Sequence, residues 1–197
     1  WRVAIAAGKR QDPASWIKIL DVSLPQVGEP LRDWQAVVIG GGLINGMSQQ
    51  NLWPREQIEL LLRERPTLAA RWRLAMEQSA AMADDEKVPA GTRYDALRML
   101  PLAGWEQRGR QLGRYLEREV DPELQRGAIS GLSDIDAPEV ADVLLHHLAD
   151  FSAANRKLAF DALLRTNARI ESLRKAVDEK RVEIEQLSPP QREKLGR

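Results

Sequence analysis

One short pattern occurs three times in this chain and constrains its fold more than any other feature. Ala96-Leu97-x-x-Leu100 recurs as Ala128-Ile129-x-x-Leu132 and again as Ala159-Phe160-x-x-Leu163, with offsets of 32 and 31 residues. A period of this length leaves room for two helices and is typical of stacked helix pairs. Since one helix pair cannot bury its own apolar face, the repeat predicts a stack in which neighbouring pairs supply the core.

The patterning of the remaining segments is helical as well. Apolar residues recur at steps of three and four within residues 68–83, 105–116 and 140–148, and Leu112 and Leu116 return as Leu144 and Leu148, again 32 residues on. With two Phe, two Tyr and no sustained alternation, strands have little support. We therefore predict an all-α fold, an α-α superhelix of the HEAT or armadillo type built from antiparallel helix pairs.

The repeat also predicts how the chain is divided. Residues 1–88 are expected to form irregular N-terminal helical layers, because the period is absent there. Residues 89–187 are expected to form three HEAT-like helix pairs. Their predicted bounds are 89–120, 121–151 and 152–187. Residues 188–197 are interpreted as the truncated start of a further helix, and because the chain opens at Trp1 without a methionine, we expect it to be a piece of a longer protein.

Helix starts are marked by capping residues. Asp12-Pro13, Asp121-Pro122 and Ser188-Pro189 each place an N-cap side chain before a proline at the first helical position. Asp136 with Glu139, and Ser188 with Gln191, have the spacing of capping boxes. In the last helix Leu195 is the only large apolar residue, so we expect packing to add little there and the tail to fray.

Four tryptophans are nearly evenly spaced in the first third of the chain. Trp16, Trp34, Trp53 and Trp72 lie 18, 19 and 19 residues apart, about one helix plus a turn. An aromatic binding stripe and simple packing between helices both fit this spacing. We favour packing, because aromatic side chains dominate the burial of apolar area in cores.

The run from Val37 to Gly46 resembles a dinucleotide-binding turn. Gly40 and Gly42 match the first two glycines of that fingerprint, but Asn45 occupies the third position, and Pro54 ends the following segment early. We predict instead a helix over residues 31–48. Glycine in a helix costs up to about 1 kcal/mol relative to alanine, so three in a row indicate that a neighbouring backbone packs closely against them.

No other cluster gives a convincing reactive or metal site. His146 and His147 are the only histidines, and adjacent helical residues point about 100° apart, which is poor geometry for one metal. The acidic run at residues 84–86 lacks the spacing and the glycine of a calcium loop and is interpreted as a loop between helices. We therefore predict no catalytic, cofactor-binding or metal-ligating residue and no cofactor in this chain.

Composition limits the classes of partner. Lys+Arg and Asp+Glu both number 29, so the basic excess typical of nucleic-acid binders is absent. The local cluster of Arg108, Arg110 and Arg114 is balanced by Glu117 and Glu119 and is interpreted as a solvated helix face. No apolar run reaches the roughly 18 residues of a membrane span. The chain has no cysteine, so thiolate metal sites and disulfides are excluded, while the compartment stays open.

Three longer strings carry a resemblance to a known family. LRDWQAVVIGGGLING (31–46), DDEKVPAGTRYDALRMLP (84–101) and DALLRT (161–166) are similar to the HEAT-like region of large secreted bacterial proteins. Those proteins join a β-propeller, described as a membrane-bound dehydrogenase domain, to HEAT-like repeats and a C-terminal cytochrome c-like haem domain. The resemblance covers about residues 31–187 and implies an extracytoplasmic location.

The same resemblance implies a role without implying a site. Haem attachment in that family needs a Cys-x-x-Cys-His motif, and this chain has no cysteine, so the family's redox chemistry would lie outside it. We therefore expect a non-catalytic α-solenoid that scaffolds or docks neighbouring domains of its parent chain or another protein, with no nucleic-acid binding and no membrane insertion. Two alternatives stay open, a nucleotide- or cofactor-binding module using Gly40 to Gly42, and a nucleic-acid-binding helical repeat.

Overall fold

The computed structural model describes all 197 residues and contains helices and no strands, which confirms the predicted all-α class. The α-helices are α1 (Arg2–Arg10), α2 (Pro13–Ser23), α3 (Asp33–Ala36), α4 (Asn45–Ser48), α5 (Pro54–Leu62), α6 (Pro66–Asp84), α7 (Ala90–Met99), α8 (Trp105–Arg114), α9 (Pro122–Ser133), α10 (Glu139–His146), α11 (Ala153–Leu163), α12 (Asn167–Asp178) and α13 (Pro189–Leu195). A π-helix, η1 (Val37–Ile44), joins α3 to α4. Short 3₁₀ segments follow as η2 (Leu100–Ala103), η3 (Leu148–Asp150) and η4 (Ile184–Gln186).

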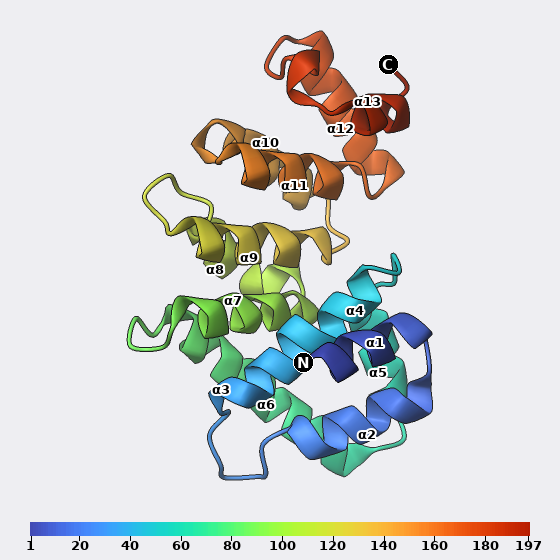
Figure 1. Ribbon diagram of the computed structural model, residues 1–197, viewed down its shortest axis with the longest axis vertical. Helices are drawn as coiled ribbons and strands as arrows, with labels where there is room; N and C mark the ends of the chain where they lie inside the picture. Colours follow the sequence, from blue (N-terminus) through green and yellow to red (C-terminus); the bar gives the residue numbers. More distant parts are fainter.

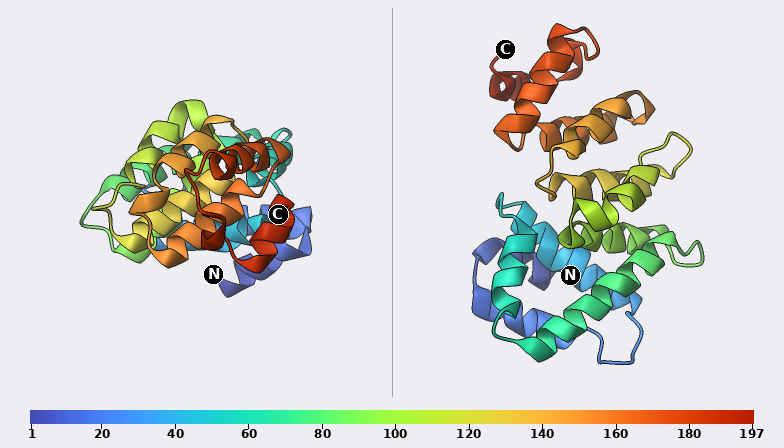
Figure 2. Two further views of the ribbon diagram at one scale, coloured as in Figure 1. Left: turned by 90° about the horizontal axis from the view of Figure 1, so that it is seen from above. Right: turned by 180° about the vertical axis from the view of Figure 1, so that it is seen from behind.

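The helices α7, α9 and α11 lie one above another along the long axis of the molecule (Figure 1). Successive members of this row are in contact, and the repeated alanines Ala96, Ala128 and Ala159 are all fully buried between them. A small side chain at this position allows two helices to approach closely. The helices α8, α10 and α12 alternate with this row along the chain and come forward in the view from behind (Figure 2).

A repeated hydrogen bond accompanies the repeated alanines. Arg93, Gln125 and Arg156 stand three residues before Ala96, Ala128 and Ala159. Each donates from its side chain to a carbonyl oxygen within or just after the helical segment that precedes its own helix. The acceptors are Ala83, Leu116 and Leu148, at 2.8, 3.2 and 3.0 Å. These bonds satisfy carbonyls that a helix end cannot pair internally, so the same contact orients three successive helices.

The segments α3, η1 and α4 form one continuous helical stretch from Asp33 to Ser48, which confirms the predicted helix across the glycine run. It lies between α1 and α7 and contacts both. A Cβ on Gly40 would overlap the carbonyl oxygen of Asp95 in α7, and a Cβ on Gly42 would lie 2.6 Å from the Cβ of Ala4 in α1. The glycines therefore allow close backbone packing on both sides of one helix.

The glycine stretch is wound as a π-helix. The Asn45 amide donates to the carbonyl of Gly40, five residues before it, as well as to that of Gly42. A π-helix is a rare conformation and is seen mostly as a single widened turn. Here it extends over eight residues in a helix whose neighbours, α1 and α7, approach to backbone contact.

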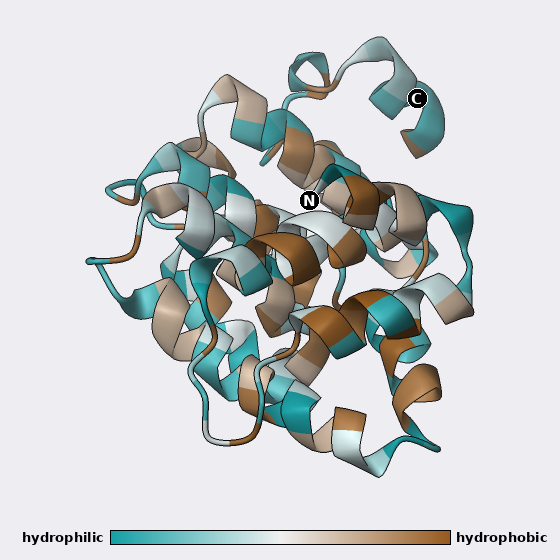
Figure 3. Cartoon of the chain, turned by 60° about the horizontal axis from the view of Figure 1, so that its bottom comes forward, coloured by the Kyte–Doolittle hydropathy of each residue, from teal (hydrophilic) through white to brown (hydrophobic).

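The apolar side chains fall into two clusters, one in the N-terminal layers and one in the stack of α7 to α13. Figure 3 shows the brown, hydrophobic segments concentrated where helices face one another, with teal, hydrophilic segments in the outer loops. Helix α7 contributes to both clusters, since Ala96 and Leu97 belong to the stack and Met99 to the N-terminal layers. Helix α6 and the segment η2 also contribute to both clusters, so the two parts of the core meet through α6, α7 and η2.

Most of the predicted helix starts are confirmed. Asp12 and Asp121 accept hydrogen bonds from the amides of Ala14 and Glu123, and α2 and α9 begin at the prolines that follow the caps. The capping box predicted for Asp136 is wrong. Helix α10 begins at Glu139 with Pro138 as its N-cap and without a side-chain cap, and residues 135–137 before it belong to no helix.

The C-terminal helix α13 has the predicted capping box, with the amide of Ser188 donating to Gln191. The expectation that packing adds little to it is wrong. Leu195 is fully buried, and Arg174 of α12 donates to its carbonyl oxygen at 2.8 Å. Gln191 also donates to the carbonyl of Lys157 in α11, so this short helix is held at both ends.

The four evenly spaced tryptophans do not form one stripe. Trp16 and Trp72 are buried, as the packing interpretation predicted, and Trp16 donates to the carbonyl of Ala7 at 2.8 Å. Trp34 is about half exposed, at 48%. Trp53 is partly buried, and its ring lies under the guanidinium of Arg165 at 4.2 Å.

Enlarging Ala128 tests the row of stacked helices. Ala128→Leu adds three carbon atoms at a fully buried contact between α7 and α11. We expect overpacking to lower the free energy of unfolding by about 1–3 kcal/mol, measured by urea denaturation. Ala154→Leu, on an exposed position of α11, is the control and should leave the midpoint nearly unchanged. Equal midpoints for Ala128→Leu and the parent would contradict the packing.

Adding one methyl group tests the contact between the glycine helix and α7. In Gly40→Ala the new Cβ overlaps the Asp95 backbone, which cannot rotate away as a side chain can. We expect a loss of about 1–3 kcal/mol in unfolding free energy despite the better helix propensity of alanine. Gly91→Ala is the matched control, because the nearest atom to its Cβ is Glu123 Oε1 at 3.9 Å. A Gly40→Ala protein as stable as Gly91→Ala would refute the contact.

Candidate functional site

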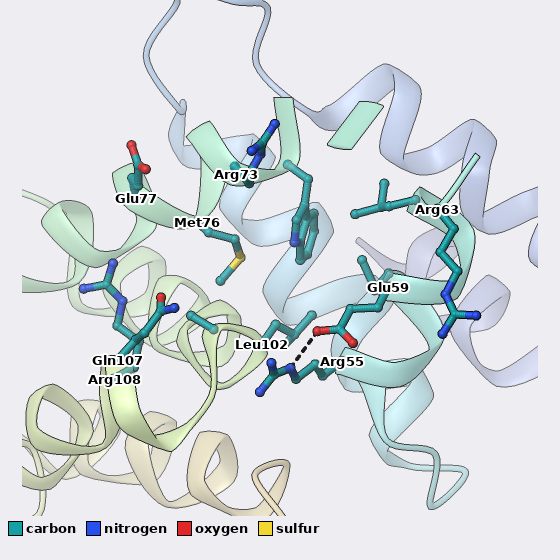
Figure 4. A pocket seen from close by; sticks show the side chains of 13 residues that line it. Arg55, Glu59, Arg63, Arg73, Met76, Glu77, Leu102, Gln107 and Arg108 are labelled. Atoms are coloured by element: carbon teal, nitrogen blue, oxygen red, sulfur yellow. Dashed lines mark hydrogen bonds and ion pairs between the residues drawn. The ribbon is translucent and has the colours of Figure 1, made fainter. Parts of the chain in front are cut away.

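A groove with a volume of about 520 Å³ lies between α5, α6 and α8. Its floor is apolar and comes from side chains that are buried but reach the surface of the groove. Ile58 lies on α5, Trp72 and Met76 on α6, and Leu102 on η2. Figure 4 shows the Met76 and Leu102 side chains at the centre, with charged side chains around them. We call this surface the arginine-rimmed groove.

The rim of the groove is rich in arginine. Its charged residues are Arg55, Arg63, Arg73 and Arg108, with Glu59 and Glu77. Arg55 and Glu59 pair with each other at 2.8 Å, and both side chains are about half exposed. The other three arginines form no ion pair within the chain. Four arginines against two glutamates leave an excess of two positive charges over the groove. Arg108, which we interpreted as part of a solvated helix face, is half-buried and lines this site.

Local helix geometry brings these residues together. Arg55 and Glu59 stand four positions apart on α5, as do Trp72 and Met76, and Arg73 and Glu77, on α6. Residues at this spacing lie on the same face of a helix. Helix α8 closes the third side with Gln107 and Arg108. An apolar floor with a polar rim is the usual form of a surface that binds another molecule.

This groove was not predicted from the sequence. Its residues come from three helices spread over residues 55–108, and no short motif contains them. The only signals in the sequence are the paired spacings on α5 and α6. They indicate a helix face but not what that face meets, because the order of packing is set by the tertiary fold.

The glycine run does not form a nucleotide site of the kind the motif would need. A dinucleotide fingerprint requires a strand before the first glycine, and Val37 to Ile39 are helical. The glycines also contact α1 and α7 directly, so their backbone faces other helices. A bound phosphate would have to displace the Asp95 carboxylate, since a Cβ on Gly41 would overlap its oxygen.

The two histidines pack against each other and not around a shared ligand. The rings of His146 and His147 meet edge to face with centroids 4.8 Å apart. His147 Nδ1 is hydrogen-bonded to Asp150 at 3.2 Å, and this bond lowers the pKa of the Asp150 carboxyl. No group of three or more histidine and carboxylate side chains converges as a metal site would.

The acidic run 84–86 lies where α6 ends, which confirms the predicted loop between helices. Asp84 accepts hydrogen bonds from the Tyr115 hydroxyl at 2.7 Å and from Arg114 at 2.9 Å. Burial raises the pKa of Tyr115 to about 12, and the bond to Asp84 acts in the same direction. Tyr115 also donates to the carbonyl of Ala83, so this contact ties α8 to the end of α6.

Asp95 is a perturbed carboxyl that the sequence analysis did not single out. It lies on α7 against Gly40 and Gly41, and its side chain has no hydrogen-bond donor within the chain. Burial raises the pKa of Asp95 to about 7, Glu123 adds to the shift, and Arg98 opposes it. The signal available in the sequence was its position one residue before the repeated Ala96, which places it beside the tightest helix contact.

Comparisons with protein families, with curated proteins and with solved structures give no match to this chain. None of its helices combines the length and the apolar character needed to cross a membrane.

The Asp95 environment predicts a pH dependence of stability. Because its folded-state pKa of about 7 lies above the unfolded value of 3.8, the folded protein binds more protons between these values. Stability should therefore fall as pH rises from about 4 to about 7 and then level off. Asp95→Asn should remove this loss and stabilise the protein at pH 8 by about 1–2 kcal/mol, a value reduced for partial solvent screening.

Urea denaturation at pH 5 and pH 8 measures this effect. Glu119→Gln, at an exposed position outside the helices, is the control for loss of one carboxylate. If Asp95→Asn and the parent keep the same difference in stability at both pH values, the proposed cost of the buried charge is absent.

Proposed function

We propose that this chain is a non-catalytic helical-repeat scaffold that docks an acidic helical segment of a neighbouring protein domain in the arginine-rimmed groove. The observation that carries the proposal is the combination of an apolar floor, formed by Ile58, Trp72, Met76 and Leu102, with two uncompensated positive charges on its rim. An amphipathic helix with one large apolar anchor and flanking carboxylates is the partner that complements both features.

The architecture supports a repeat scaffold. In the row of α7, α9 and α11, each helix has a buried alanine at an equivalent position. Three residues before it, a side chain donates a hydrogen bond to a carbonyl oxygen of the preceding segment. We interpret these units as three HEAT-like pairs of an α-solenoid. Solenoids present extended concave surfaces, and protein binding is their usual use.

The floor of the groove suits an apolar anchor. Methionine is flexible and polarizable, so Met76 can adapt to an aliphatic or aromatic side chain. Trp72 lines the same floor, with 8% of its surface exposed. Anchors that enter such pockets carry most of the binding energy in protein interfaces.

The family resemblance supplies a context for this role. A segment that connects a dehydrogenase-type propeller and a cytochrome c-like domain would act outside the cytoplasm as a spacer or docking surface, and its partner would be one of those neighbouring domains. In this proposal the redox groups belong to the other domains, and this chain contributes position and contact.

A fluorescence anisotropy experiment tests the proposal with a designed probe. The probe is a labelled amphipathic helical peptide with one leucine anchor and flanking glutamates, and the matched control peptide has lysines in place of the glutamates. We expect saturable binding of the acidic peptide that weakens with added salt. Arg63→Glu and Arg73→Glu should each weaken it by about tenfold, equivalent to roughly 1.4 kcal/mol.

The control variant is Arg2→Glu, an exposed arginine on α1 outside the groove, which should bind the acidic peptide as the parent does. A single-stranded DNA oligonucleotide serves as a second probe, because arginines also bind phosphates. Equal binding of acidic and basic peptides, no effect of the groove variants, or tighter binding of the oligonucleotide would each reject the proposal.

A further inference from the structure

A buried cluster of arginines joins the N-terminal layers to the stacked helices. Asp134, at the end of α9, has a fully buried carboxylate that accepts hydrogen bonds from Ser48 of α4 at 2.6 Å and from Arg165, and it forms an ion pair with Arg98 of α7 at 3.0 Å. Arg165 also donates to the carbonyl of Leu52 at 2.6 Å. We call Asp134 with Arg98, Arg165 and Arg169 the Asp134 cluster.

The cluster has more positive than negative charge. Asp134 is the only carboxylate in ion-pair contact with its arginines, and it serves both Arg98 and Arg165. Arg169 is 2% exposed and donates only to backbone carbonyls, among them Ala162 and Ser133. Burial lowers the pKa of Arg169 to about 10, and the nearby Arg165 adds to this effect.

Several donors of these arginines have no acceptor within the protein. The Nε atoms of Arg98, Arg165 and Arg169 are buried and without a partner. The side chains of Arg98 and Arg165 are only 3% and 10% exposed. A buried cation without full compensation is costly, and a guanidinium keeps its proton at physiological pH. An anion beside the cluster would therefore offset this cost.

A polar groove of about 410 Å³ lies against the cluster and is distinct from the arginine-rimmed groove. Arg98 and Arg165 form part of its wall, together with Lys194 of α13 at the exposed rim. The remaining lining is mostly hydroxyl and amide side chains. Its members include Asn45, Ser48, Asn51, Ser130 and Ser133. Two carboxylates, Asp134 and Asp161, also line the groove. Asp161 accepts a hydrogen bond from Gln191 at 2.7 Å.

We propose that this polar groove binds an oxyanion, a phosphate or carboxylate group held by Arg98, Arg165 and Lys194 and by the hydroxyl of Ser130. Guanidinium groups match the planar and tetrahedral oxygens of such anions and form strong charge-assisted hydrogen bonds with them. Since the cluster connects α4, α7, the end of α9 and the turn that follows α11, an anion bound here would also strengthen the contact between the two parts of the core.

Thermal unfolding at constant ionic strength tests this site with inorganic phosphate as the probe and chloride as the reference. We expect the melting temperature to rise with phosphate and to saturate, because a ligand that binds only the folded state stabilises it. Isothermal titration should give the dissociation constant directly. Lys194→Gln should weaken phosphate binding about two- to fivefold, as expected for one exposed charge.

Ser130→Asp is a second variant that leaves the buried arginines in place. It introduces a negative charge at a half-buried position in the groove, which should repel an anion. It should abolish the phosphate response, while Lys18→Gln, an exposed lysine on α2, should leave the response unchanged. No saturable effect of phosphate, or an equal effect in the parent, Lys194→Gln and Ser130→Asp, would overturn the proposal.

The source of the oxyanion is distinguished by parallel titrations with sulfate and with acetate. Binding of phosphate and sulfate without acetate would assign the site to a tetrahedral anion, and tighter binding of acetate than of either would assign it to a carboxylate. The result is independent of the docking proposal. Arg73→Glu should weaken peptide binding about tenfold and keep the phosphate response.

Discussion

The fold depends on the close packing of one glycine-rich helix between two others. Gly40 faces the Asp95 backbone in α7, and Gly46 faces α1, where a Cβ would overlap the carbonyl of Ile5 and where Gly8 stands opposite. Side chains on these positions would hold the helices apart. Because α7 also begins the row of stacked helices and contributes to both apolar clusters, this contact fixes the N-terminal layers against the repeats.

The other features of the molecule follow from that arrangement. With α7 fixed, η2 and α8 meet α5 and α6, and the apolar floor of the arginine-rimmed groove forms between them. On another side α4 is brought to α9, so that Ser48 reaches the buried carboxylate of Asp134. Each groove thus lies where helical segments distant in sequence meet, and such places are where ligands are commonly bound.

The sequence predicted those features that are set by local chemistry. The helix across Gly40, the caps at Asp12 and Asp121 and the repeated alanines are encoded within a few residues, and the structure has them. Features that depend on tertiary contacts were missed or wrong. The neighbour of Leu195 is a helix about 20 residues before it, so its burial could not be inferred from its own short helix, and the arginines of both grooves come from separate helices.

Native-state hydrogen exchange, followed by mass spectrometry across a series of low denaturant concentrations, measures the central contact directly. If the glycine helix and α7 form one packed unit, the amides of residues 37–44 and 96–100 should open with the same free energy and the same denaturant dependence, equal to those of global unfolding. Opening of residues 37–44 at a clearly lower free energy, while α7, α9 and α11 stay protected, would contradict the account.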